Sequence, residues 1–251
     1  MKENWKSYFC NVNSKLASIA LNLGLSEDAP MHEKPWLLWV WVYLQRPRPD
    51  GLSDRSEFDT ICAIEDELAK QLAFACQTVE AGRITTGGRR EFYFYGADEK
   101  GFKKAVRTAM DRFRKYKFDL GTQHEPDWNQ YRSVLFPSEE DMRRIANRDV
   151  LDTLEQHGDT LEPVRDVHHW IYFKHPEDRE RYAEEARELG YALEDRAEDL
   201  ERERPYGLTI TRDQSVTPEK INEAVLELFR MAKKADAEYD GWKAQLVATK
   251  N

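Results

Sequence analysis

Two adjacent histidines, His168 and His169, are the first candidates for chemistry, because imidazole can hold a metal ion or transfer a proton. They lie in the segment DVHHWIYFK, residues 166–174, which reads as a β-strand. Successive strand residues point to opposite faces of a sheet, so the two imidazoles diverge. Nothing nearby has the Cys/His spacing of a zinc site. We therefore predict no metal and no cofactor, with His169 at the margin of the core and His168 at a surface.

A second candidate site is the loop GTQHEPDWNQY, which clusters His124, Glu125, Asp127 and Trp128 after the end of a predicted strand. A histidine beside carboxylates can act as a general base. Pro126 and Asp127 equally describe a turn and a helix start, which is the interpretation we favour. An enzyme or small-ligand site in the loop from His124 to Trp128 stays open as the alternative.

Other catalytic patterns are missing from the sequence. The adjacent carboxylates Glu65, Asp66 and Glu67 occupy successive helix positions and fan outward, so we expect a solvated helix face. The sequence contains no GxSxG, P-loop or GxGxxG motif. We predict a protein that is not an enzyme.

Composition and charge indicate a globular chain. The 251 residues are 40% hydrophobic, enough for one large domain or two ordinary ones. The longest apolar run, residues 36–44, is too short to cross a bilayer, and residues 1–9 do not resemble a signal peptide. The three cysteines form no CxxC pair, and we interpret them as small apolar residues. These features predict a cytoplasmic protein without a membrane partner.

The net charge of −9 is concentrated in one region. Residues 177–203 hold twelve Asp or Glu against five Arg. Such a surface repels a phosphate backbone and favours a basic protein partner. A solvated helix and loop is the simpler interpretation of the same charges.

The order of predicted elements repeats once along the chain. Two strand-like runs at 5–12 and 16–25 form a hairpin, and a βαββαβ pattern follows from residue 36 to 121. A long helix over 138–158 leads to a second βαββαβ pattern from 167 to 247. The fold class predicted is α+β: two tandem ferredoxin-like (βαββαβ) sandwiches with antiparallel sheets, an extra N-terminal β-hairpin and a linking helix. The predicted domains are 1–137 and 138–251, the latter including the linking helix.

Aromatic residues gather on the sheet face that the helices of such a sandwich leave uncovered. Strand alternation sends Leu38, Val40, Val42, Leu44, Phe92 and Phe94 toward the helices. The opposite face then carries Trp39, Trp41, Tyr43, Tyr93, Tyr95, His168, Trp170 and Tyr172. Burying one aromatic side chain contributes about 1.5 to 3 kcal/mol, so a patch of this size should be covered.

Three covers for this face are open. The two sheets or two chains of a homodimer can pack on it, a protein partner can bind it, or bases of single-stranded RNA can stack on it. RNA predicts basic surroundings and an RNP1 motif, but RREFYFYG lacks the interior glycine of that motif. We therefore expect protein packing, and no direct nucleic-acid binding.

Five segments of the second half carry a resemblance to a known family: NRDVLDTLEQHGD, VRDVHHWIYFK, DRERYAEEARELGY, YGLTITR and YDGW, in that order. Together they resemble the RraB family of ribonuclease E regulators. The first half, with SKLASIALNLGL, PWLLWVWVYL, RREFYFYG and PDWNQY, resembles domain of unknown function 695. The RraB resemblance implies a non-catalytic regulator that binds the scaffold region of ribonuclease E and alters RNA decay. Its YDGW motif adds Asp240 and Trp242 as contact candidates.

Overall fold

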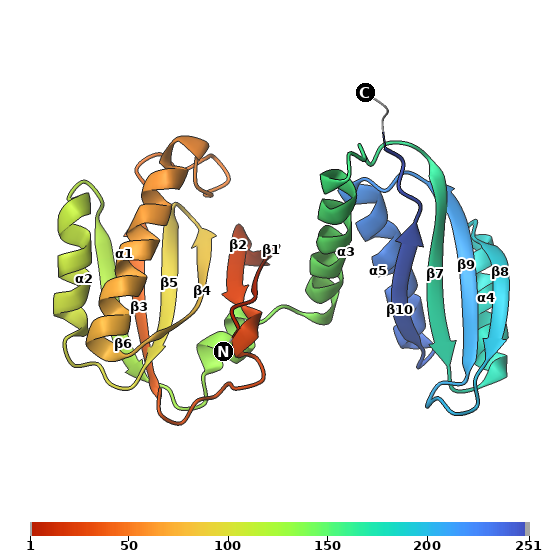
Figure 1. The fold of residues 1–251 in the computed structure, drawn as a ribbon, viewed down its shortest axis with the longest axis horizontal. Helices are drawn as coiled ribbons and strands as arrows, with labels where there is room; N and C mark the ends of the chain where they lie inside the picture. Colours follow the sequence, from red (N-terminus) through yellow and green to blue (C-terminus); the bar gives the residue numbers. More distant parts are fainter. Residues whose placement is uncertain (1, 249–251) are drawn as a thin grey trace. The chain divides into compact units, whose positions relative to one another are not determined.

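The computed structural model describes residues 2–248, which form two compact units. The first unit ends at Asp141 and the second begins at Met142. Each unit contains one antiparallel sheet and several helices (Figure 1). The α+β class predicted from the sequence is confirmed.

The first unit contains a six-stranded sheet in the order β1-β2-β4-β5-β3-β6, in which all neighbouring strands are antiparallel. Its strands are β1 (Trp5–Val12), β2 (Lys15–Asn22), β3 (Trp36–Tyr43), β4 (Val79–Thr86), β5 (Arg89–Gly96) and β6 (Phe118–His124). Helices α1 (Phe58–Cys76) and α2 (Phe102–Met110) lie on one side of this sheet (Figure 1). Short helical turns are η1 (Leu23–Leu25), η2 (Arg55–Glu57), η3 (Asp111–Phe113) and η4 (Gln130–Leu135).

Tight turns set the register of two strand pairs. Gly87 and Gly88 join β4 to β5 with φ values of +55° and +82°, a conformation that glycine adopts at little cost. Strands β1 and β2 form the predicted hairpin, and β2 pairs with β4. The hairpin therefore extends the six-stranded sheet.

The core of the first unit lies between the sheet and the two helices. The strand residues predicted to face the helices are all buried there, which confirms the alternation: Leu38, Val40, Val42, Leu44, Phe92 and Phe94. They pack against Ile61, Leu68 and Leu72 of α1 and Phe102 and Val106 of α2. Residues spaced by three or four along each helix supply its apolar stripe.

The second unit contains a four-stranded antiparallel sheet in the order β10-β7-β9-β8. Its strands are β7 (Arg165–Phe173), β8 (Ala192–Glu198), β9 (Tyr206–Gln214) and β10 (Glu238–Ala244). Helices α4 (Pro176–Glu188) and α5 (Pro218–Lys234) each begin with proline, whose fixed φ suits the first helical turn. Helix α3 (Glu139–Gln156) is the predicted linking helix.

The core of the second unit lies under α4 and α5. Val167, Ile171 and Phe173 of β7 pack there with Tyr182 of α4 and Leu228 of α5. Leu151 of α3 belongs to the same cluster, together with Leu208 and Ile210 of β9. One face of the sheet is thus occupied by helices of its own unit.

A buried ion pair fixes the start of β7. The Asp159 carboxylate pairs with the Arg165 guanidinium and also accepts the backbone N–H of Leu161 at 2.8 Å and of Val247 at 2.9 Å. The bond from Arg165 lowers the pKa of Asp159 to about 2, although burial acts in the opposite direction. One carboxylate therefore ties three separate segments together.

No helix within residues 2–248 is long and apolar enough to cross a membrane.

Candidate binding surface

The face of the four-stranded sheet that points away from α4 and α5 carries the side chains singled out in β7. His168, Trp170 and Tyr172 are half-buried on this face, whereas His169 between them is fully buried on the other. The two histidines therefore point apart, as their alternation predicts. Among the described residues, no group of three or more His, Cys, Asp or Glu side chains could hold a metal ion.

The exposed face of this sheet is hollowed beside Trp170. The hollow has a volume of about 380 Å³, and its lining includes His168 and Trp170 of β7, Thr209 of β9 and Lys243 of β10. Glu194 and Asp195 of β8 close one side. An indole wall flanked by one ammonium and two carboxylates suits a partner with both apolar and charged groups.

His168 and Glu194 are directly linked in this hollow. His168 Nδ1 lies 2.6 Å from Glu194 Oε2. The imidazole also lies near-parallel to the Trp170 ring, with 6.4 Å between centroids and 23° between planes. The bond to Glu194 therefore limits the orientation of the ring next to Trp170.

Tyr172 lies at the other end of the strand under a cation. The Arg202 guanidinium is 4.2 Å from the centre of the Tyr172 ring. A methyl group on Gly207, the cross-strand neighbour, would lie 3.3 Å from Tyr172 Cε1, so the ring rests on this glycine. Tyr172 is thus packed from two sides by Arg202 and Gly207.

The two candidates from the YDGW motif have different surroundings. Asp240 is exposed in the bulge that interrupts β10 between Tyr239 and Gly241. Trp242 pairs with His169, so it shares the helix-facing side, and its Nε1 donates to Asn147 Oδ1 of α3 at 2.8 Å. The indole of Trp242 therefore fastens β10 to α3, on the face opposite Trp170.

The corresponding face of the first unit is partly open. Trp39 and Trp41 are half-buried, with 4.5 Å between ring centroids, and Arg89 lies 4.1 Å from the centre of the Trp41 ring. Trp39 covers Gly121 of β6, because a Cβ there would lie 2.3 Å from its Cζ2. Tyr43, at the strand end, donates to Asp119 Oδ2 at 2.6 Å.

Tyr93 and Tyr95 are buried within the first unit, so they present no open surface. The covers expected for this face were a second sheet, a second chain, a protein partner or RNA. The cover over Tyr95 is instead the unit's own segment from Glu125 to Phe136. Trp128 stacks on Tyr95 with 3.9 Å between centroids and 7° between planes. Tyr93 OH donates to Glu91 Oε2 at 2.6 Å.

The covering segment is anchored by hydrogen bonds. Glu125 Oε1 accepts the Tyr95 hydroxyl at 2.6 Å and the Gln130 N–H at 2.7 Å. Tyr131 OH donates to Asn22 O at 2.9 Å, and Trp128 Nε1 donates to Lys34 O at 2.9 Å. Burial, followed by the bond to Glu125, raises the pKa of Tyr95, so its hydroxyl stays protonated.

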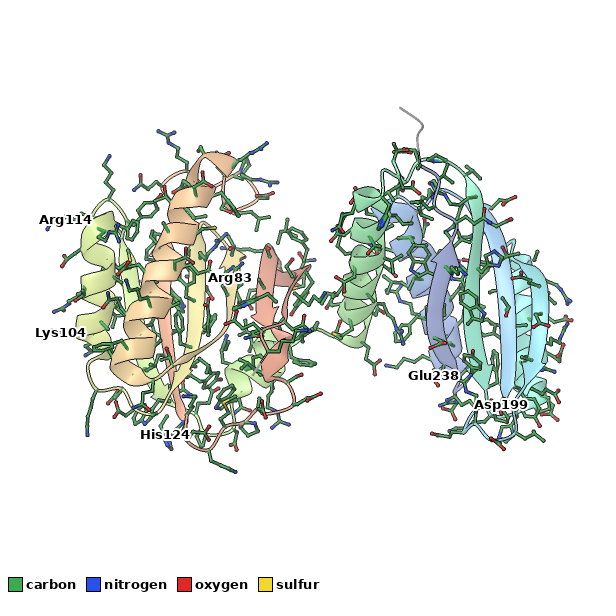
Figure 2. The ribbon with its side chains drawn as sticks, viewed as in Figure 1. Arg83, Lys104, Arg114, His124, Asp199 and Glu238 are labelled. Carbon is green, nitrogen blue, oxygen red and sulfur yellow. The ribbon has the colours of Figure 1, made fainter. Side chains whose placement is uncertain are left out.

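The loop considered for a small polar site is this same covering segment. Glu125 and Trp128 are buried and already bonded, whereas His124 at the end of β6 (Figure 2) and Asp127 are exposed. The His124 ring meets the edge of Trp36, with 5.2 Å between centroids. The carboxylate of Glu125 therefore has a structural role, because its hydrogen bonds anchor the covering segment.

A charged cluster under α1 was also not predicted from the sequence. The prediction that Glu65 lies on a solvated face is wrong: it is 8% exposed, and Arg83 of β4 (Figure 2) donates to it. Arg90 of β5 lies 3.8 Å from the same carboxylate. The reason is position, because Glu65 follows the buried Ile64 on the helix flank above β4. Burial, followed by repulsion from Glu65, raises the pKa of Glu80 far above its usual range.

Residues 3–136 match the model of a family of unknown function, DUF695, and residues 144–244 match the model described as Regulator of ribonuclease activity B, RraB. No curated protein matches the chain. A solved structure of an unknown protein from Galdieria sulphuraria is 9% identical, covers 84% of this chain and 99% of its own, and has a TM-score of 0.22. That overall likeness is too low to support an argument about fold or function.

Proposed function

Because the chain belongs to the DUF695 family and carries an RraB domain over residues 144–244, we propose that it is a non-enzymatic regulator that binds a protein through the exposed sheet face of its second unit. An RraB domain points to a regulatory role exercised through protein binding. The proposed face consists of His168, Trp170, Tyr172, Glu194 and Lys243.

One observation carries the choice of this face. Trp170 is a half-buried indole beside a hollow of about 380 Å³, and helices of its own unit occupy only the opposite side of the sheet. Tryptophan is enriched among the residues that contribute most to protein interfaces. Trp39, Trp41 and Tyr43 of the first unit are a secondary proposal, since they are partly open but pack on one another.

The first candidate partner is the scaffold region of ribonuclease E. The description of the matched family, a regulator of ribonuclease activity, supports this candidate. A cytoplasmic location belongs to the same proposal, and the three free cysteines agree with a reducing compartment.

We also infer that both units are ferredoxin-like sandwiches. The element order βαββαβ supports this, as do the antiparallel orders β4-β5-β3-β6 and β10-β7-β9-β8. In both, the first and third strands of the pattern are central. A domain boundary at residues 137 and 138 agrees with α3, which begins at Glu139.

The proposal is tested with the full chain and a purified ribonuclease E scaffold region in a calorimetric titration. Trp170→Ala should weaken binding by about tenfold or more, because a central indole contributes about 2 kcal/mol or more. Phe74→Ala is the control, since this ring on α1 is 90% exposed and lies outside the proposed face. Equal affinities for both variants and the unaltered chain would contradict the proposed face, and no binding by any of them would contradict this partner.

Two other occupants give different results in parallel measurements. If Trp170→Ala instead weakens salt-sensitive retention of single-stranded RNA, the face is a base-stacking surface. If it converts a dimer to a monomer in sedimentation, the face binds a second copy of the chain. Either result would replace the protein regulator proposed for this surface.

A further inference from the structure

A groove runs between α4 and α5, on the outer side of the helix layer of the second unit. It consists of two adjoining hollows of about 370 and 570 Å³, which share Glu185, Met231 and Lys234. Tyr182 OH donates to Leu228 O at 3.0 Å and holds the two helices together beneath it. The groove is therefore a built feature of the helix pair, and it is separated from Trp170 by the sheet.

The floor of the groove is apolar. Tyr182 and Ala235 line the first hollow, Leu189 and Leu226 line the second, and Met231 lines both. Leu189, which follows the last residue of α4, is 39% exposed. Methionine and leucine on an open helix face suit an apolar side chain from another molecule.

The rim of the groove is acidic. Its linings contain six carboxylates and three cations: Asp178, Glu185, Glu188, Glu223, Glu227 and Asp236 against Arg181, Arg230 and Lys234. Some of these carboxylates are already paired, such as Asp178 with Arg181 and Asp236 with Lys174. Glu185 and Glu188 are exposed on α4 and line the second hollow.

We propose that this groove binds a basic amphipathic helix of a partner protein, with apolar residues on the floor and Lys or Arg between the carboxylates. Charge complementarity selects this occupant, because the negative rim repels phosphate and anionic lipid surfaces. It also repels the same groove of a second copy. The floor selects a helix that presents an apolar stripe with spacing of three and four residues.

This inference goes beyond the sheet-face proposal and concerns a separate surface. The length of α4, 13 residues, corresponds to about 20 Å, so a helix of about 14 residues spans the groove. The partner segment and the partner surface for Trp170 need not belong to one molecule.

The probe is a synthetic helical peptide of about 14 residues with a leucine stripe flanked by lysines. It is titrated into the full chain by calorimetry. The double variant Glu185→Lys/Glu188→Lys should weaken binding by about tenfold or more, and binding should weaken as salt is added. A second probe with every lysine replaced by glutamate should not bind.

Matched controls separate local recognition from net charge. Glu184→Lys/Glu201→Lys changes the same charge at exposed positions outside the groove, and it should weaken binding less than about threefold. Glu185→Gln/Glu188→Gln should give an intermediate loss and is the variant to use if the lysine pair does not fold. Equal losses for the two lysine pairs, or tight binding of the glutamate peptide, would overturn the proposal.

One further variant separates the two surfaces. Trp170→Ala should leave binding of the lysine peptide unchanged, because Trp170 lies on the other face of the sheet. Loss of peptide binding in Trp170→Ala would contradict a separate groove site. Loss of ribonuclease E binding alone would bear only on the sheet-face proposal.

Discussion

The two units share the order strand, helix, strand, strand, helix, strand, yet the sheet face opposite their helices is covered to different extents. In the first unit, the segment from Glu125 to Phe136 returns over the sheet and buries Tyr95. In the second unit, Trp170 lies beside an open hollow. Aromatic residues on the equivalent face of the sheet can therefore serve internal packing in one copy of a fold and remain available for binding in another.

The polar groups buried on the helix side differ as well. The first unit places Glu65, Glu80, Arg83 and Arg90 together, and the Glu80 carboxyl is held protonated by burial and by Glu65. The second unit buries a neutral histidine, His169, whose Nδ1 lies 2.8 Å from Tyr239 OH. Burial lowers the pKa of His169 to about 3, with smaller contributions from Arg212 and His168.

The largest expected effect concerns the covered face. Tyr95→Ala should destabilise the first unit by about 3 to 5 kcal/mol, because it removes a fully buried ring and the stack with Trp128. Trp170→Ala should cost less than about 1 kcal/mol in the second unit, since its indole is partly exposed. Hydrogen exchange resolved by peptide measures each unit within the full chain. Equal losses in the two units would remove the distinction between covered and open faces.

The next effect is a loss of stability of the second unit in acid. The unfolded chain protonates His169 near pH 6.5, but the folded unit does so only near 3, so stability is lost as the pH falls through this window. The loss should be roughly 3 kcal/mol between about pH 6.5 and 4. Denaturant melts at several pH values should show this loss of stability in the unaltered chain but not in His169→Gln. His168→Gln is the control and should lose stability in acid as the unaltered chain does. If His169→Gln also loses stability by the same amount, His169 is not the group responsible.

A smaller effect of opposite sign is expected in the first unit. Above about pH 4.5 the unfolded chain ionises Glu80 while the folded unit keeps it protonated, so stability falls as the pH rises. Glu80→Gln removes this penalty and should stabilise the unit by roughly 1 to 2 kcal/mol at pH 7.5, with no gain at pH 4. Asp66→Asn, at an exposed position on α1, should change little. A destabilised Glu80→Gln at pH 7.5 would show that the carboxyl is ionised when folded.

Strand positions and their inward residues followed from the sequence because alternation is a local property. The turn between β4 and β5 was equally local, since Gly87 and Gly88 readily adopt the positive φ values that it requires. The residues buried under the helices of the first unit, such as Leu38 and Phe92, were predicted correctly for the same reason.

Whether the opposite face is covered could not be predicted from the sequence, because the cover is a segment distant from the strands. Trp128, Tyr131 and Leu135 have helical spacing directly after β6, and this apolar stripe was the available signal. The side of the sheet that Trp242 occupies is likewise set by the pairing of β10 with β7, in which Trp242 lies opposite His169. No local sequence pattern reveals this pairing. The buried Glu65 required the two arginines of β4 and β5 on its flank.

The most direct test of the distinction is hydroxyl-radical footprinting of the full chain with and without the ribonuclease E scaffold region. Trp170 should be oxidised in the free protein and protected in the complex, whereas Trp128, which is 0% exposed, should stay unreactive in both. Unchanged oxidation of Trp170 in a complex shown to have formed would contradict the open sheet face as the docking surface.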